Sequence, residues 1–284
     1  MLRPVGTWGY PRLAALVLWE MRGNVLVAIL LCIASAPLNE DLARRLSPEA
    51  LLPILTIVVT VFTGFRSNQA YLRWWEARLI WGAMVNESRN WQLQLLALLP
   101  VAAEGSPQHT ALLERQVQLV WTLNRELRPG GTAPTPSSQE LLSQQAQALR
   151  ALAASGSLDP SGLQSLLRVQ DGICNALGGL ERIRLTPIPA AYDLFIRILV
   201  WSFGFLLFVR LDVLDQGLGT LEGFLGFLAF ITAERLAAFT ENPFQSKVFG
   251  LPMNHICATI SRDLLGASHP LAVPPEGSQS PVWS

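Results

Sequence analysis

Four apolar stretches constrain this chain more than any other feature. They cover about residues 13–36, 51–65, 194–209 and 221–239. In lipid a helix satisfies all its own backbone hydrogen bonds, and it needs about 20 apolar residues to cross a bilayer. Only 15% of the residues are charged, against roughly 25% in an average soluble domain. The sequence therefore predicts an all-α integral membrane protein with four transmembrane helices.

The first apolar stretch contains charged and polar residues near its middle. Glu20, Arg22 and Asn24 interrupt it. Each charge at mid-span costs about 2.5–3.5 kcal/mol on insertion scales. We therefore expect this span to be broken or shifted. The second and third stretches are shorter than a full span, so we expect their helices to run past the apolar part or to end against water and protein.

The region between the second and third stretches is too polar for lipid, and its sequence predicts helices. No proline occurs from Phe65 to Leu99, so the second span can continue as one long helix into water. Apolar residues recur near a 3.6-residue period over 110–127, which is typical of an amphipathic helix. Residues 129–137 contain glycines and prolines and are expected to form a loop.

Two further helix starts are marked by capping residues. Ser137 and Glu140 form a capping-box pattern. Asp159 followed by Pro160 is typical of an N-cap with proline at the first helical position. This second helix is expected to reach about Arg184, before the prolines that follow. The Pro- and Ser-rich segment from residue 269 onward is expected to be poorly ordered.

The distribution of arginines predicts the topology. Arg66 and Arg73 follow the second span, and Arg182 and Arg184 precede the third. Because positive residues near span ends favour the cytoplasmic side, we expect a multi-pass protein of the cell inner (plasma) membrane with cytoplasmic termini. The N-terminus lacks the apolar core and cleavage site of a secretory signal, so we expect it to be retained.

Common catalytic and binding motifs are missing from the sequence. It contains no GxSxG, HExxH, Walker loop or GxGxxG. His255 and Cys257 could bind a metal. Two possible ligands do not make a site, and the simpler interpretation is that they are ordinary residues near a helix start. Asp212 and Asp215 are expected to be solvated in a short loop. The formal net charge is zero, so nucleic acid is not an expected partner. We predict no catalytic residue, no cofactor and no metal site.

A stripe of apolar residues follows the second span. Ile57, Val61 and Phe65 are four residues apart, so on a helix they form a stripe about 12 Å long. Spacing alone favours packing against a neighbouring helix, because apolar stripes are common and pores are rare.

Three longer motifs resemble the bestrophin family, especially its bacterial branch. The first is GFRSNQAYLRWWEAR at 64–78, with related residues up to 89. The second is LERIRLTPIPAAY at 180–192, and the third is ENPF at 241–244, followed by LP at 251–252. The motifs occur in the family's order and cover most of residues 50–265.

The resemblance implies a homopentameric ion channel with four membrane helices per subunit and a helical cytosolic region. It implies that Ile57, Val61 and Phe65 form a hydrophobic neck on the five-fold axis, and that Ile188 forms a separate cytosolic constriction. The corresponding division of the chain is 1–65 with two membrane helices, 66–191 in the cytosol, 192–240 with two membrane helices, and 241–284 as a cytosolic C-terminal segment. Expected partners are further copies of the chain, membrane lipid and permeant monovalent ions.

One departure from the family concerns calcium. Eukaryotic bestrophins follow Asn-Pro-Phe with acidic residues that bind calcium, whereas this chain has Gln245, Ser246 and Lys247. A hard divalent cation needs several oxygen ligands, and Glu241 and Asn242 alone do not supply them. Calcium gating of the eukaryotic kind is therefore not expected.

Several alternatives stay open at this level. Animal members conduct anions, while some bacterial relatives resemble cation channels, and an apolar neck does not fix the sign of the ion. The family majority favours anions such as chloride, and a cation (sodium-type) channel of the same fold is the alternative. A non-conducting membrane scaffold is a second alternative. A membrane enzyme would need Glu20, Arg22, Glu234 and Arg235 around a common cavity; these residues are more simply placed at span ends or subunit contacts. Arg73, Glu76, Arg78 and Glu181 are candidates for contacts within or between subunits.

Overall fold

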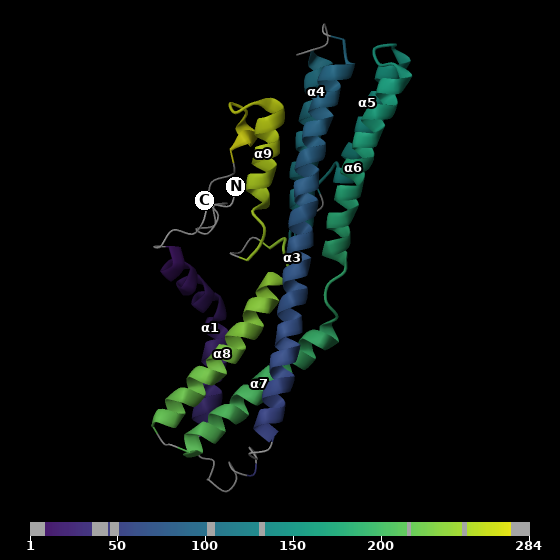
Figure 1. The fold of residues 1–284 in the computed structure, drawn as a ribbon. Helices are drawn as coiled ribbons and strands as arrows, with labels where there is room; N and C mark the ends of the chain where they lie inside the picture. The colour runs from purple at the N-terminus through teal and green to yellow at the C-terminus, as the bar shows by residue number, and fades with distance from the viewer. Residues whose placement is uncertain are drawn as a thin grey trace. The chain divides into compact units, whose positions relative to one another are not determined.

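The computed structural model describes residues 9–35, 45, 51–100, 106–130, 134–214, 217–245 and 249–273 (Figure 1). Every regular element in these ranges is helical, which confirms the predicted all-α class. The elements are α1 (Gly9–Ser35), α3 (Leu51–Leu98), α4 (Pro107–Leu127), α5 (Ser138–Ala154), α6 (Pro160–Leu185), α7 (Ala190–Leu214), α8 (Leu218–Thr240), α9 (Met253–Leu265) and the 3-10 helix η2 (Pro270–Ala272).

Four of the described helices are long and apolar enough to cross a membrane. They are α1 over Ala14–Ser35, α3, α7 over Ala190–Asp212, and α8. The four predicted spans are thus confirmed by length and composition. The α3 helix has 48 residues, so the second span does continue as one helix far beyond its apolar part.

The described residues fall into two compact units. The first, here called the span unit, covers Pro4–Trp74 and Pro187–Asn242; the second, the bundle unit, lies within Trp75–Thr186 and Pro243–Ser284. The span unit holds α1, the first half of α3, α7 and α8. The bundle unit holds the second half of α3 with α4, α5, α6, α9 and η2.

The prediction of a broken first span is wrong, because α1 is continuous through its charged middle. The Arg22 guanidinium donates to the Trp19 carbonyl oxygen at 2.7 Å and lies 4.5 Å from the centroid of the Trp19 ring. Glu20 is half-buried and Arg22 is exposed. The charge is therefore satisfied by side-chain contacts one turn away, and the backbone hydrogen bonds of the helix need not break.

Close packing of α7 against α8 depends on two glycines. A Cβ atom at Gly204 would lie 2.1 Å from Cδ2 of Phe227, and one at Gly223 would lie 3.0 Å from Cα of Phe208. Phe227 is fully buried, in a cluster with Met21 and other residues of α1 and α8. The two helices approach each other this closely because neither glycine carries a side chain.

The bundle unit has an apolar core crossed by a ladder of polar side chains. Gln116 of α4 donates to Oγ of Ser88 on α3 at 2.9 Å, and Gln145 of α5 donates to Oε1 of Gln116 at 2.9 Å. All three side chains are buried. The ladder joins three helices and fixes their register, because a slipped partner would leave a buried amide unsatisfied.

Both predicted helix starts are confirmed in the bundle unit. Ser137 and Glu140 form the reciprocal capping box of α5, and Asp159 caps α6, which ends at Leu185. These caps form because short polar side chains satisfy the free amides of a first helical turn.

The expectation of a poorly ordered tail is wrong for residues 269–273. The η2 helix begins where Nδ1 of His269 accepts from the amide of Leu271 at 3.2 Å, and Arg262 donates to the carbonyl of Ala272 at 3.1 Å. Ala272 is buried. Residues 274–284, the rest of the predicted tail, lie outside the described residues.

Candidate functional site

The predicted neck residues lie on an exposed face of α3. Ile57, Val61 and Phe65 are 67%, 47% and 60% exposed. The opposite face carries Val59, which is buried against Ile196 and other residues of α7. The stripe is therefore not packed against another helix among the described residues of its own chain, which was the alternative that spacing alone favoured.

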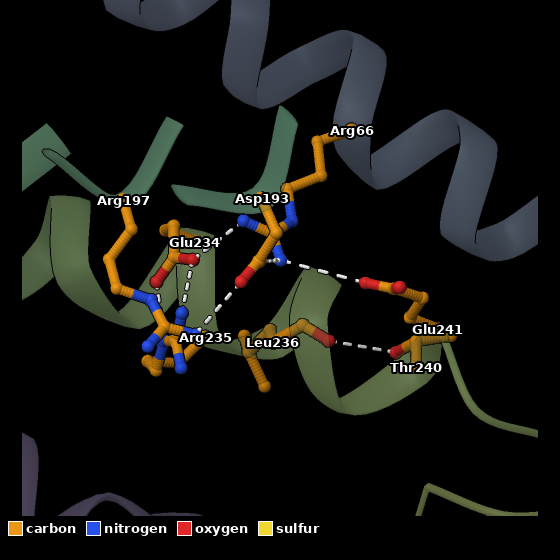
Figure 2. A network of polar contacts seen from close by, with 8 residues as sticks. All are labelled: Arg66, Asp193, Arg197, Glu234, Arg235, Leu236, Thr240 and Glu241. Atoms are coloured by element: carbon orange, nitrogen blue, oxygen red, sulfur yellow. Dashed lines mark hydrogen bonds and ion pairs between the residues drawn. The ribbon is translucent and has the colours of Figure 1, made fainter. Parts of the chain in front are cut away.

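The residue after the stripe, Arg66, points into the span unit and is 1% exposed. Its Nη1 donates to Oε1 of Glu234 at 2.8 Å, and its Nη2 donates to Asp193 and lies 3.5 Å from Oε2 of Glu241. Figure 2 shows these groups converging on one guanidinium from two segments of the chain, the start of α7 and the end of α8. Arg66 thus links the end of the apolar part of α3 to the start of α7 and the end of α8.

Two further arginines contact these acids. Arg235 donates two hydrogen bonds to Glu234, and Arg197 donates to Oδ2 of Asp193 at 3.1 Å (Figure 2). The set therefore has three arginines and three acids, so its charges balance when all are ionised. We call these six residues the Arg66 network: Arg66, Asp193, Arg197, Glu234, Arg235 and Glu241.

Burial makes the ion pairs of the Arg66 network important for stability. Glu234 is 0% exposed, and a charge buried without a partner destabilises a protein strongly. Burial also raises the pKa of Glu241, against the opposing effect of the Arg66 charge. Each acid of the network has an arginine as its neighbour, so no carboxylate in it is buried without a basic partner.

The Arg66 network also fixes how α3 is turned about its axis. Successive residues on a helix are about 100° apart, since each turn takes 3.6 residues. Holding Arg66 inside the unit therefore holds Phe65 on the adjoining exposed face. Arg66 and the stripe therefore lie on two different faces of the same segment of α3.

Ile188 lies on the non-helical segment between α6 and α7. Its side chain is half-buried. The carbonyl of Pro189 accepts from the amides of Tyr192 and Asp193 at 3.0 and 3.2 Å. The start of α7 is thus anchored directly after Ile188.

The sequence interpretation missed the Arg66 network. It used Arg66 for topology and as part of the first family motif, and it assigned Glu234 and Arg235 to span ends or subunit contacts. A signal was present, because Arg66 follows one apolar stretch, Asp193 precedes another, and Glu234 lies near the end of a third. Opposite charges at span ends on the same membrane side favour such a pairing.

The other charged residues considered in the sequence analysis lie outside the Arg66 network. Glu76 pairs with Arg182 within the bundle unit, and both side chains are largely exposed. Asp212 lies in the last turn of α7, not in a loop as expected, and accepts from the hydroxyl of Thr220. Asp215 lies outside the described residues.

His255 and Cys257, the pair considered for metal binding, have no further metal ligands near them among the described residues. The thiol of Cys257 is buried and donates to the carbonyl of Val120 at 3.6 Å, and burial raises its pKa. Burial lowers the pKa of His255. No cluster of three or more His, Cys, Asp or Glu among the described residues could hold a metal ion. Residues 246 and 247, where the calcium motif departs from the family, lie outside these residues.

Comparisons with known proteins agree on one family. A model of bacterial and fungal bestrophin proteins matches residues 12–266. The voltage-dependent anion channel-forming protein YneE of Escherichia coli is 30% identical over 242 residues, which cover 78% of this chain and 77% of YneE. A voltage-dependent anion channel-forming protein of Synechocystis sp. is 27% identical over 288 residues, covering 89% and 91% of the two chains.

The fold agrees with the same family. The crystal structure of a bacterial bestrophin homolog from Klebsiella pneumoniae matches with a TM-score of 0.75 at 26% identity, covering 89% of this chain and 100% of that one. These matches confirm the resemblance that the sequence motifs indicated. The chain belongs to the bestrophin family, in its bacterial and fungal branch.

Proposed function

We propose that five copies of this chain form an anion channel in the inner (plasma) membrane, with the termini and the bundle unit in the cytoplasm. The observation that carries the proposal is the exposed apolar stripe of Ile57, Val61 and Phe65 on a candidate span. The names of the curated relatives support anions as the permeant ions.

A ring of these side chains would form the neck of the pore. One subunit presents a single stripe, so closing a pore requires several copies around an axis. A narrow apolar ring controls ion passage by dewetting and offers no group that coordinates an ion. The neck would therefore set the height of the barrier, and charges elsewhere along the pore would select the ion.

Exposed apolar residues on the second half of α3 support contact between copies. Trp75, Leu79, Leu93 and Leu96 are all exposed in the single chain. They form two pairs whose members lie one turn apart along the helix, and apolar side chains exposed outside lipid often mark protein–protein contacts. Burial against a neighbouring subunit would remove this surface from water at about 25 cal/mol per Å².

Ile188 would form a second constriction, at the cytosolic end of the pore. Pro187 and Pro189 lack backbone N–H groups and keep this segment out of a helix. The side chain of Ile188 is thus held on a short connector whose direction the prolines restrict.

Recording from planar bilayers tests the channel and the sign of its ion. The purified protein is reconstituted between unequal KCl solutions, and unitary currents are measured. Currents that reverse near the chloride equilibrium potential support the proposal. Reversal near the potassium potential would instead indicate a cation channel of the same fold, and protein without currents would indicate a non-conducting scaffold.

A matched pair of variants tests the neck. Replacing Ile57, Val61 and Phe65 together by alanine should raise the unitary conductance, because a wider and less apolar ring stays wet. The control replaces Ile198 of α7 and Leu225 of α8, which are equally apolar and exposed. An equal rise in both variants would contradict the neck assignment.

A further inference from the structure

The α1 helix packs against the rest of the span unit along one face. Met21 and Ala28 are fully buried, in a cluster with residues of α8. The residues of this face recur every three or four positions, as one side of a helix requires: Val17, Met21, Val25, Ala28 and Cys32. The opposite side of α1 therefore faces away from α7 and α8.

The opposite side, which we call the outer face of α1, carries one charge among apolar residues. Its members lie within about 80° around the helix, at 100° per residue. All of them are exposed: Trp19, Arg22, Leu26, Leu30 and Ile33. Because α1 is long and apolar enough to cross a membrane over Ala14–Ser35, this face is available to lipid.

The guanidinium of Arg22 points toward the N-terminal end of α1. Its Nη1 donates to the carbonyl oxygen of Trp19 at 2.7 Å, so the charged group lies about one turn before its own Cα. Arginines in membrane spans extend toward the headgroups in this way. Tryptophan also favours the membrane–water interface. Both residues therefore place the polar boundary of one leaflet near Trp19.

The apolar part of the outer face matches the thickness of one leaflet. Leu30 lies 11 residues beyond Trp19, which is about 16 Å along a helix. The hydrocarbon core of a bilayer is about 30 Å thick, so one leaflet supplies about 15 Å of it. An acyl chain whose headgroup is held by Arg22 would therefore run past Leu26 and Leu30.

The chemistry of Arg22 suits a phosphate group. A guanidinium has five N–H donors, and the carbonyl of Trp19 accepts from one. Arginine binds phosphate oxygens through paired hydrogen bonds, and the exposed side chain of Arg22 can still form these. Glu20, the acid nearest in sequence, is half-buried and lies about 160° around the helix from Arg22, away from the outer face.

The contact between Arg22 and Trp19 favours a headgroup with net negative charge. The guanidinium carbon lies 4.5 Å from the centroid of the Trp19 ring, so a cation already covers this aromatic face. The choline of a zwitterionic headgroup would bring a second cation, which Arg22 repels and the occupied ring does not attract. An anionic headgroup such as phosphatidylglycerol has a phosphate without an attached cation.

We propose that the outer face of α1 binds an anionic phospholipid. Arg22 donates to the phosphate, Trp19 holds the guanidinium at the headgroup level, and Leu26 and Leu30 contact an acyl chain. The site belongs to the span unit and contains no residue of the neck or of the Arg66 network. It is measured by lipid binding, so its test does not depend on whether the protein conducts ions.

Quenching of Trp19 fluorescence by brominated lipids tests the proposal. The full-length protein is reconstituted into mixtures of phosphatidylcholine and phosphatidylglycerol, with one of the two lipids brominated in each series. The chain has nine tryptophans, so the Trp19 signal is taken as the difference between the wild type and Trp19→Phe. We expect phosphatidylglycerol to bind beside Trp19 about fivefold more tightly than phosphatidylcholine, the preference that one arginine gives for anionic lipid. Equal quenching by the two lipids would overturn the proposal.

Variants assign the lipid preference to Arg22. Arg22→Gln should abolish the preference for phosphatidylglycerol, and Arg22→Lys should retain part of it because the charge is kept. Arg150→Gln removes an exposed arginine of α5 outside the spans and should leave the preference unchanged. An Arg22→Gln protein with the preference of the wild type would show that the lipid is attracted elsewhere, and the assignment to Arg22 would be wrong.

Two further results would identify a different occupant of the outer face. A lipid site should be insensitive to soluble sn-glycerol 3-phosphate, because this compound lacks the acyl chains that contact Leu26 and Leu30. Relief of quenching by sn-glycerol 3-phosphate at the concentration of the lipid would indicate a site for free phosphate compounds. Absence of Trp19 quenching by either brominated lipid would indicate that another copy of the chain covers the outer face. Either result would refute a phospholipid site.

Discussion

Arg66 and Glu234 form a buried ion pair, 2.8 Å between Nη1 and Oε1, that joins the end of the apolar part of α3 to α8. Their positions are 168 residues apart in the sequence. The same Arg66 is adjacent to Phe65, which is exposed. A structural pairing inside the span unit therefore determines which face of α3 is left for other copies of the chain.

Removing the charge of Arg66 should destabilise the fold. In Arg66→Met, Asp193 and Glu234 lose their shared partner in a buried place, which typically costs about 3–5 kcal/mol. Chemical unfolding in detergent, followed by tryptophan fluorescence, measures the loss. Arg66→Met leaves three acids with two arginines in the network. Combining it with Glu234→Gln should restore part of the stability, because two acids then face two arginines.

The exposed pair between Arg182 and Glu76 provides the control for Arg66. Since both side chains are largely solvated, Arg182→Met should change stability by less than about 1 kcal/mol. If Arg66→Met were as mild as Arg182→Met, the structural role assigned to the Arg66 network would be wrong.

Substituting Gly204 should disturb the packing of α7 on α8. Because the added Cβ would lie 2.1 Å from the buried ring of Phe227, we expect Gly204→Ala to lose about 1–3 kcal/mol through overpacking. Thermal unfolding measures the effect. Gly23→Ala in α1 meets no atom within 4 Å and should be neutral or stabilising, so similar losses at both positions would contradict this account.

Substituting Ile188, the proposed second constriction, should change ion conduction without impairing folding. Ile188 is only half-buried, so Ile188→Ala should leave the unfolding temperature nearly unchanged. We expect a higher unitary conductance or altered permeability ratios between anions. Bilayer recordings with mixed anions measure both, and unchanged currents and ratios would argue against a constriction at Ile188.

The number of copies is open to direct measurement. We expect the detergent-solubilised protein to have five times the mass of one 31.2 kDa chain, because a single stripe on α3 cannot close a pore. Light scattering corrected for bound detergent, or native mass spectrometry, determines the mass. A stable monomer or dimer as the main species would contradict both the pentamer and the channel.

Local signals in the sequence identified most helices. Caps such as Ser137 with Glu140 act through hydrogen bonds within one turn, and apolar stretches act through the hydrophobicity of consecutive residues, so both are readable without the fold. The interpretation of α1 was wrong although the relevant contact is also local: Arg22 contacts Trp19 one turn earlier, and the helix continues through both residues.

The sequence by itself determined the four spans, the uninterrupted α3 and the bestrophin family, since each depends on neighbouring residues or on contiguous motifs. Only the tertiary structure decided that Arg66 turns inward to Glu234 while Ile57, Val61 and Phe65 remain exposed. The four-residue spacing of the stripe is the same whether its side chains are buried or exposed, so spacing does not distinguish the two. Its exposure depends on which residues from α7 and α8 pack on the other face of α3, and the partners of a buried charge are set by that packing.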